Sequence, residues 1–101
     1  MNVVQTVKFG FTDLSSRARA SRIREHALEI INADRHAEFD LSGVESISAS
    51  FADELFGVLL LELGEERFFE AVRVREANEH VLRSIALAIV RRRSRLSPEA
   101  A

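Results

Sequence analysis

Residues 40–55 read Asp40-Leu-Ser-Gly-Val-Glu-Ser-Ile-Ser-Ala-Ser-Phe-Ala-Asp-Glu-Leu55. This stretch leaves a short apolar strand, passes through small and hydroxyl-bearing residues, and enters a helix that is expected to begin at Ser50. Parallel α/β domains commonly bind ligands and phosphate groups where a strand leads into a helix. We therefore expect any specific function of the chain to reside between Gly43 and Glu54.

Apolar and β-branched residues predict strands on both sides of this stretch, and apolar residues three and four positions apart predict the helices. The predicted elements, in order, are strand 3–11, helix 16–32, strand 38–41, helix 50–64, strand 68–74 and helix 78–93. This β-α-β-α-β-α order favours an α/β fold with a small, mostly parallel sheet and helices packed on it. The pattern leaves open whether the first strand pairs within the chain or with a neighbour.

Particular residues predict where the later helices begin and end. Ser50 is a suitable N-cap, and Asp53 three positions beyond it gives an arrangement like a capping box. Gly64 is well placed to end that helix, and Asn78 to cap the last one.

The composition indicates one soluble domain. The chain has 101 residues, of which 47% are hydrophobic and 30% charged, and its net charge is −2. It has no cysteine, so it contains neither a disulfide nor a cysteine zinc site. No secretory signal is recognisable, and no apolar run approaches the ~20 residues that cross a bilayer. We expect a cytoplasmic protein with one domain over 1–93 and a flexible tail over 94–101.

Four carboxylates, those of Asp40, Glu45, Asp53 and Glu54, are candidates for a paired-carboxylate or magnesium site. The simpler interpretation places Asp53 and Glu54 at the positive end of a helix and leaves Glu45 in solvent. The three histidines share no ligand spacing, and the glycines form no phosphate-binding loop. We therefore expect no enzyme, no metal ion and no other cofactor.

Arginines gather in two segments, 17–24 and 91–95. Nucleic-acid binding requires such clusters, but the chain is acidic overall and its phenylalanines mostly fall at positions typical of a core. Solvated helix faces are the better explanation. We expect neither a nucleic-acid nor a membrane partner.

Ser48 and Ser50 supply hydroxyls to the turn. In the structural interpretation Ser50 is an N-cap and Ser48 a turn residue. In the functional interpretation one of them carries a phosphate, which free backbone N–H groups would stabilise and the carboxylates of Asp53 and Glu54 would oppose. The two interpretations are compatible, and the sequence favours the structural one.

The strings Asp40-Leu-Ser-Gly-Val-Glu-Ser-Ile-Ser48 and Ser50-Phe-Ala-Asp-Glu-Leu55 resemble the STAS-like family of unknown function, a bacterial and archaeal branch related to anti-sigma factor antagonists. The resemblance covers about 9–93. It implies a STAS-like fold, a regulatory role in bacterial signalling, and a partner that is a histidine-kinase-like ATPase or another anti-sigma-type protein. STAS domains place a phosphorylated serine where this chain has Ala49. The resemblance therefore implies that the phosphoacceptor has moved to Ser50, or secondarily to Ser48, or has been lost.

Together these features predict a non-enzymatic module that docks its partner through the turn Ser46–Asp53 and the helix after it. Its expected partner-binding residues are Glu45, Ser46, Asp53 and Glu54. The alternative is a sensor that holds a small ligand or nucleotide at the same strand-to-helix crevice. A third class is a homodimer, because the apolar face over 55–63 is wider than one sheet requires.

Overall fold

The computed structural model of the chain describes residues 3–96. The elements, in order, are β1 (Val3–Lys8), β2 (Asp13–Leu14), α1 (Arg17–Asn32), β3 (Arg35–Asp40), β4 (Ser46–Ile47), α2 (Ala49–Ala52), the π-helix η1 (Asp53–Gly57), α3 (Val58–Leu63), α4 (Glu65–Ala71), β5 (Val72–Arg75) and α5 (Glu79–Leu96). Strands alternate with helices, which confirms the predicted α/β class.

The main sheet has the order β1-β3-β5, and all its strands are parallel. The first strand therefore pairs within the chain, with Val7 opposite Phe39 of the central strand. A second parallel sheet consists only of β2 and β4, where Leu14 lies opposite Ile47. This small sheet was not predicted, because two-residue strands leave no periodic pattern in the sequence.

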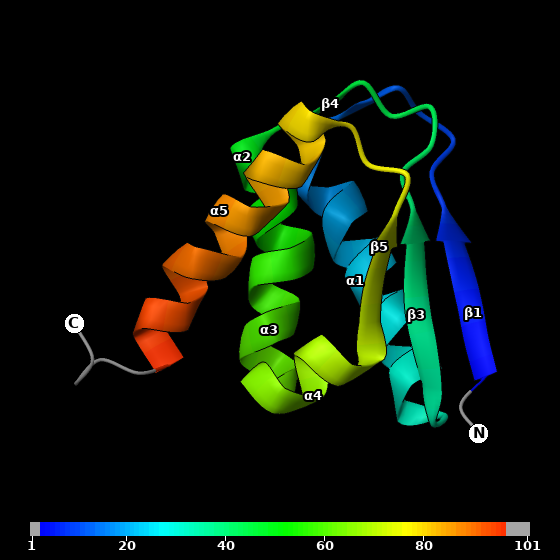
Figure 1. Cartoon of the computed structure of the whole chain (residues 1–101), viewed down its shortest axis with the longest axis vertical. Coiled ribbons are helices and arrows are strands. Elements are labelled where there is room, and N and C mark those ends of the chain that lie inside the picture. The colour runs from blue at the N-terminus through cyan, green and yellow to red at the C-terminus, as the bar shows by residue number, and fades with distance from the viewer. Residues whose placement is uncertain (1–2, 97–101) are drawn as a thin grey trace.

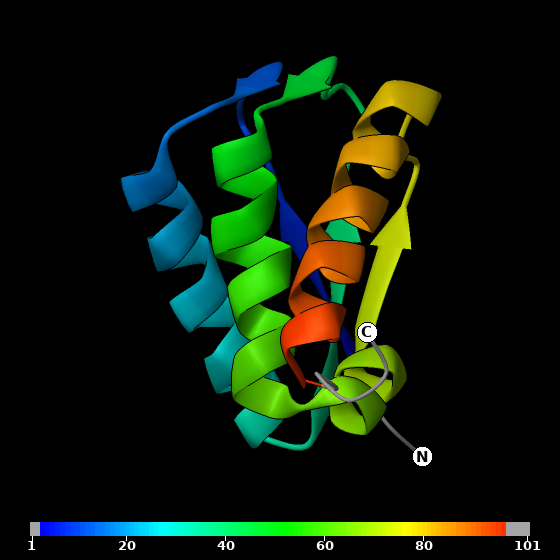
Figure 2. The same cartoon turned by 90° about the vertical axis from the view of Figure 1, so that its left-hand side faces the viewer.

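Helices cover one face of the main sheet (Figures 1 and 2). The elements α2, η1 and α3 form one continuous helical rod that lies between α1 and α5 (Figure 2). Leu55, Leu59 and Leu60 of this rod are fully buried, and Phe56 packs edge-on against Phe39 at 5.1 Å between ring centroids. The wide apolar face that favoured a homodimer is thus largely covered within the chain, because the rod packs against two helices as well as a sheet.

The strand predicted over 68–74 is wrong in its first half, because residues 65–71 form the helix α4. Gly64, at φ 85°, ends α3, and its carbonyl oxygen accepts a hydrogen bond from the Phe68 backbone N–H at 3.0 Å, which starts the next helical turn. Phe68 and Ala71, three positions apart, bury the same helix face. The strand β5 begins only at Val72.

Three other element boundaries differ from the prediction by three residues each. The strand β1 ends at Lys8, and β3 begins at Arg35 rather than at residue 38. The helix α5 continues to Leu96, past the expected domain end at Arg93. Residues 97–101 of the expected tail lie outside the described part of the chain. Within 3–96, no helix is both long and apolar enough to cross a membrane.

Candidate functional site

The turn that leads into α2 is held on both sides by hydrogen bonds to other segments. The backbone N–H of Ser48 donates to the carbonyl of Leu14 at 2.8 Å, and that of Glu45 to the carbonyl of Thr12 at 2.7 Å. The side-chain amide of Asn78 donates to the carbonyl of Glu45 at 3.1 Å. Asn78 also accepts from the Val81 backbone N–H at 2.8 Å, which confirms it as the cap of α5. The turn is therefore a fixed surface feature.

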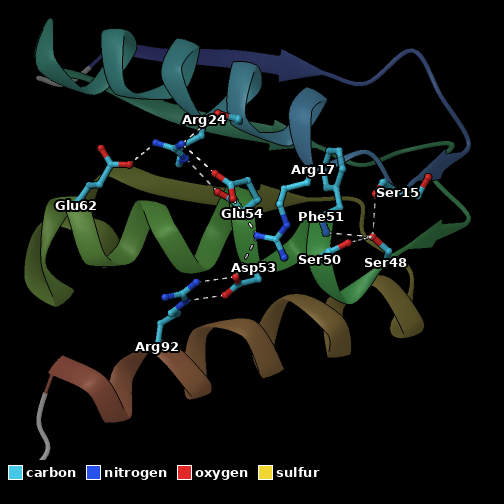
Figure 3. A network of polar contacts seen from close by, with 11 residues as sticks. Ser15, Arg17, Arg24, Ser48, Ser50, Phe51, Asp53, Glu54, Glu62 and Arg92 are labelled. Atoms are coloured by element: carbon cyan, nitrogen blue, oxygen red, sulfur yellow. Dashed lines mark hydrogen bonds and ion pairs between the residues drawn. The ribbon is translucent and has the colours of Figure 1, made fainter.

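Ser48, and not Ser50, is the N-cap of α2, so the predicted capping register is wrong by two residues. The Ser48 hydroxyl accepts from the Phe51 backbone N–H at 3.0 Å and lies 3.2 Å from the Ser50 hydroxyl (Figure 3). Ala49 and Ser50 are consequently the first two residues inside the helix. Ser50 is half-buried and borders an open groove, whereas the Ser48 hydroxyl already holds the helix end.

Replacing Ser48 with alanine is expected to lower the free energy of unfolding by about 1 kcal/mol, because the Phe51 N–H loses its capping partner. Ser48→Asn should retain most of the stability, since asparagine caps as well as serine does. Ser50→Ala is expected to change stability by less than about 0.5 kcal/mol, as a substitution without a cap to lose. Urea unfolding at pH 7 tests this order, and equal losses for Ser48→Ala and Ser50→Ala would contradict it.

Asp53 is held by an arginine from the far end of the chain. Its two carboxylate oxygens accept from Nε and Nη2 of Arg92, both at 2.7 Å, and Arg17 lies 3.6 Å away (Figure 3). The Arg92 side chain is only 19% exposed. This hydrogen bonding, together with the arginine charges, holds the pKa of Asp53 below its ordinary value of 3.8 despite partial burial.

Glu54 is paired with two arginines of α1. Its carboxylate binds Arg17 at 3.0 Å and Arg24 at 3.0 Å, and Arg24 also pairs with Glu62 (Figure 3). Arg24 is 14% exposed and donates through Nε to the backbone carbonyl of Glu54 at 3.1 Å. The predicted solvated helix faces are therefore wrong for Arg24 and Arg92, which lie against the central rod and hold its carboxylates.

These contacts surround the π-helix η1, in which the Val58 N–H donates to the carbonyl of Asp53, five residues back. The wider turn releases the Glu54 carbonyl from the usual helical pattern, and Arg24 supplies a donor to it. π-Turns inside α-helices frequently occur at functional sites. The sequence did not reveal Arg17, Arg24 and Arg92 as partners of η1. The available signal was the adjacent carboxylates of Asp53 and Glu54 in an otherwise apolar helix.

The remaining candidate residues lie apart from this network. Glu45 is exposed on the turn, and the Ser46 hydroxyl donates to the Asp13 carboxylate. The Asp40 carboxylate, 7% exposed, accepts from the Ser42 backbone N–H at 3.0 Å. Hydrogen bonds from Ser42, with help from nearby positive charges, hold the pKa of Asp40 below its ordinary value. No group of three acidic or histidine side chains within 3–96 is placed to hold a metal ion.

A groove of about 630 Å³ opens beside Ser50, between the start of α1, the start of α2 and α5. The groove is lined by Arg17, Ala49, Ser50, Asp53, Ser84, Leu87, Ala88, Arg91, Arg92 and Arg95. It brings together the two arginine segments that lie at opposite ends of the sequence.

Stability is expected to fall below about pH 4 because of Asp53. A carboxylate whose folded pKa lies below its unfolded value contributes stability that is present above the unfolded pKa and is lost as the pH falls through the folded pKa. Asp53→Asn should therefore lower stability at pH 7 and flatten the decline between about pH 4 and 2; Asp40 maintains a residual slope.

Urea unfolding across this pH range measures the effect, with Glu45→Gln as a control of equal charge change at an exposed site. A decline in Asp53→Asn as steep as in the unmodified protein would show that the Asp53–Arg92 pair contributes no pH-dependent stability.

Comparison with known proteins identifies one family. The sequence model described as "STAS-like domain of unknown function (DUF4325)" matches residues 19–82, a segment that includes most of α1, the turn, the central rod and the start of α5. No curated protein and no solved structure matches the chain.

Proposed function

The chain belongs to this STAS-like family of unknown function, and from that premise we propose that it is a non-enzymatic regulatory module that docks a histidine-kinase-like ATPase of the anti-sigma type. The docking surface is the turn Ser46–Asp53 together with the partly exposed side chains of the helix after it. Glu45, exposed beside the turn, and Ser50, half-buried within it, are candidate contacts.

One observation carries this proposal: the turn is partly exposed, and its backbone is held by hydrogen bonds to other segments. Exposed side chains at Glu45 and Ala49 stand on a backbone fixed by β2 and by Asn78. Preformed surfaces bind partners with less ordering entropy than mobile loops do. Asp53 and Glu54 have internal ion pairs, so their effect on docking would be to hold the helix in place beneath the turn.

Ser50 is the switchable hydroxyl in this proposal. Its side chain is not used as a cap, and it shares a groove with Arg17 and Arg91. A phosphate placed beside arginines gains charge-assisted hydrogen bonds. The opposing charge of Asp53 is neutralised by Arg92. Transfer of the γ-phosphoryl group of ATP to the Ser50 hydroxyl, with release of ADP and a proton, would change the surface presented to the partner.

The test is intact mass and complex formation after incubation with ATP and an anti-sigma-type ATPase from the same genome. The expected result is a stable complex and the added mass of one phosphoryl group, which is lost in Ser50→Ala and retained in Ser48→Asn. Ser48→Asn keeps the helix cap while removing the other hydroxyl. A complex without added mass supports docking and contradicts the switch. Absence of both contradicts the proposed function.

The alternative class was a small-ligand or nucleotide sensor at the strand-to-helix crevice. At that crevice the Asp40 carboxylate is engaged by Ser42 and lies 3.6 Å from Arg75. These contacts occupy the polar groups that a ligand at the strand end would use, so this alternative remains second.

A further inference from the structure

The groove beside Ser50 concentrates positive charge on a chain that is acidic overall. Four arginines and one aspartate line it, and even when Glu54, which pairs with Arg17, is counted, the arginines outnumber the carboxylates by two, whereas the whole chain carries −2. Arg17 comes from the start of α1, and Arg91, Arg92 and Arg95 come from the end of α5. Chain folding thus brings like charges together from distant segments.

Two of these arginines are available to an added ligand. Arg91 and Arg95 form no ion pair with any other residue in the described range 3–96. They are four positions apart on α5, which places them on the same face of the helix. Arg92, by contrast, is fixed by its two bonds to Asp53. Mutual repulsion among close cations opposes folding, and an anion in the groove would relieve it.

The shape and the remaining lining indicate what kind of anion fits. About 630 Å³ lies within the range of roughly 300–1,000 Å³ that small-molecule sites occupy. Ser50 and Ser84 offer hydroxyls, while Leu87, 44% exposed, gives the groove an apolar wall. Planar guanidinium groups match the oxygens of phosphate and can bind them in pairs.

We propose that this groove binds a polyphosphate chain, with the phosphates along Arg17, Arg91 and Arg95 and any organic part of the ligand against Leu87. The inference rests on the arginines of the groove and not on a docked partner, although the groove shares Ala49, Ser50 and Asp53 with the proposed docking surface. The two sites meet at Ser50, so that a bound ligand would cover the hydroxyl proposed as the switch.

Calorimetric titration of the purified chain with tripolyphosphate, and separately with ATP, tests the proposal at constant ionic strength. Thermal unfolding at five times the measured Kd should then show a rise of about 4 °C or more. Arg91→Ala/Arg95→Ala is expected to weaken binding at least about tenfold, as the loss of two charged hydrogen-bonding partners implies. The matched control is Arg73→Ala/Arg83→Ala, which removes two exposed arginines outside the groove and should retain the affinity.

The two probes distinguish the sources of the phosphate chain. Tighter binding of ATP, with the advantage lost in Leu87→Ser, identifies an organic polyphosphate such as a nucleotide. Equal binding of both probes shows that the groove recognises the phosphate chain without an organic part, as in inorganic polyphosphate. Failure of both probes to bind, or equal weakening by the two double variants, overturns the proposal.

Discussion

Replacing Arg24 with alanine is expected to lower the free energy of unfolding by about 3 kcal/mol, because it removes the donor to the Glu54 carbonyl and leaves the largely buried Glu54 carboxylate with Arg17 alone. Arg24 binds the carboxylate of Glu54, the backbone carbonyl of Glu54 and the carboxylate of Glu62. The Glu54 side chain is only 16% exposed, so water replaces the lost donor incompletely. A loss of this size should lower Tm by about 12 °C or more in a domain of 101 residues.

Arg24 also donates a hydrogen bond to the backbone at the π-turn, in addition to its ion pairs. Because the Glu54 carbonyl depends on the Nε of Arg24, Arg24→Lys should recover less than half of the stability. A lysine ammonium is a single point charge and lacks the forked donor geometry of a guanidinium. Backbone amides in η1 are expected to exchange hydrogen faster in both variants, since the turn loses its support from α1.

The control for Arg24 is Arg22, which is exposed on the same helix. Arg22→Ala should change stability by less than about 0.5 kcal/mol, as is usual for surface positions. Urea unfolding monitored by circular dichroism compares the variants. A loss in Arg24→Ala no larger than in Arg22→Ala would mean that the arginine does not support the π-turn.

The alternation of strands and helices was predictable because it follows from the local spacing of apolar residues. In α1, Ala20, Ala27, Ile30 and Ile31 recur at helical spacing and are all buried. The end of α3 at Gly64 and the cap of α5 at Asn78 were predictable for the same reason, since each depends on the residue type at one position. Family membership was predictable from the residues of the turn.

The candidate site was less predictable because its contacts join distant segments. Asp53 and Arg92 are 39 residues apart, and Arg24 and Glu54 are 30 apart. The partner of a charged residue can be identified only when the topology is known. In the sequence, these arginines therefore resembled ordinary solvent-exposed residues. Ser48 and Ser50 could not be distinguished as caps for another reason. Moving the start of the helix by two residues still places a serine at the cap position. Residues 68–71 were mistaken for a strand because adjacent phenylalanines also suit β-structure.

Gly57 carries the second large expected effect. It is fully buried in the middle of the rod, where alanine would ordinarily be favoured over glycine by about 1 kcal/mol. A Cβ at this position, however, would lie 2.7 Å from the Asp53 carboxylate oxygen and 2.9 Å from Cγ of Arg92. The short aspartate is held by two bonds and cannot move without breaking them. Gly57→Ala is therefore expected to lower the free energy of unfolding by about 2 kcal/mol.

A double-mutant cycle separates this steric effect from a general intolerance of the position. In Asp53→Ala the clashing oxygen is absent and Arg92 is released, so adding Gly57→Ala should be neutral or stabilising. The expected coupling between the two substitutions exceeds about 1 kcal/mol, whereas independent sites add within about 0.5 kcal/mol. Gly10→Ala is the matched control, because a Cβ there meets no atom within 4 Å. Additive losses in the cycle would show that Gly57 is required for a reason other than the Asp53–Arg92 pair. The predicted coupling would instead establish that position 57 requires glycine because the Asp53–Arg92 pair, which lines the groove beside Ser50, lies directly against it.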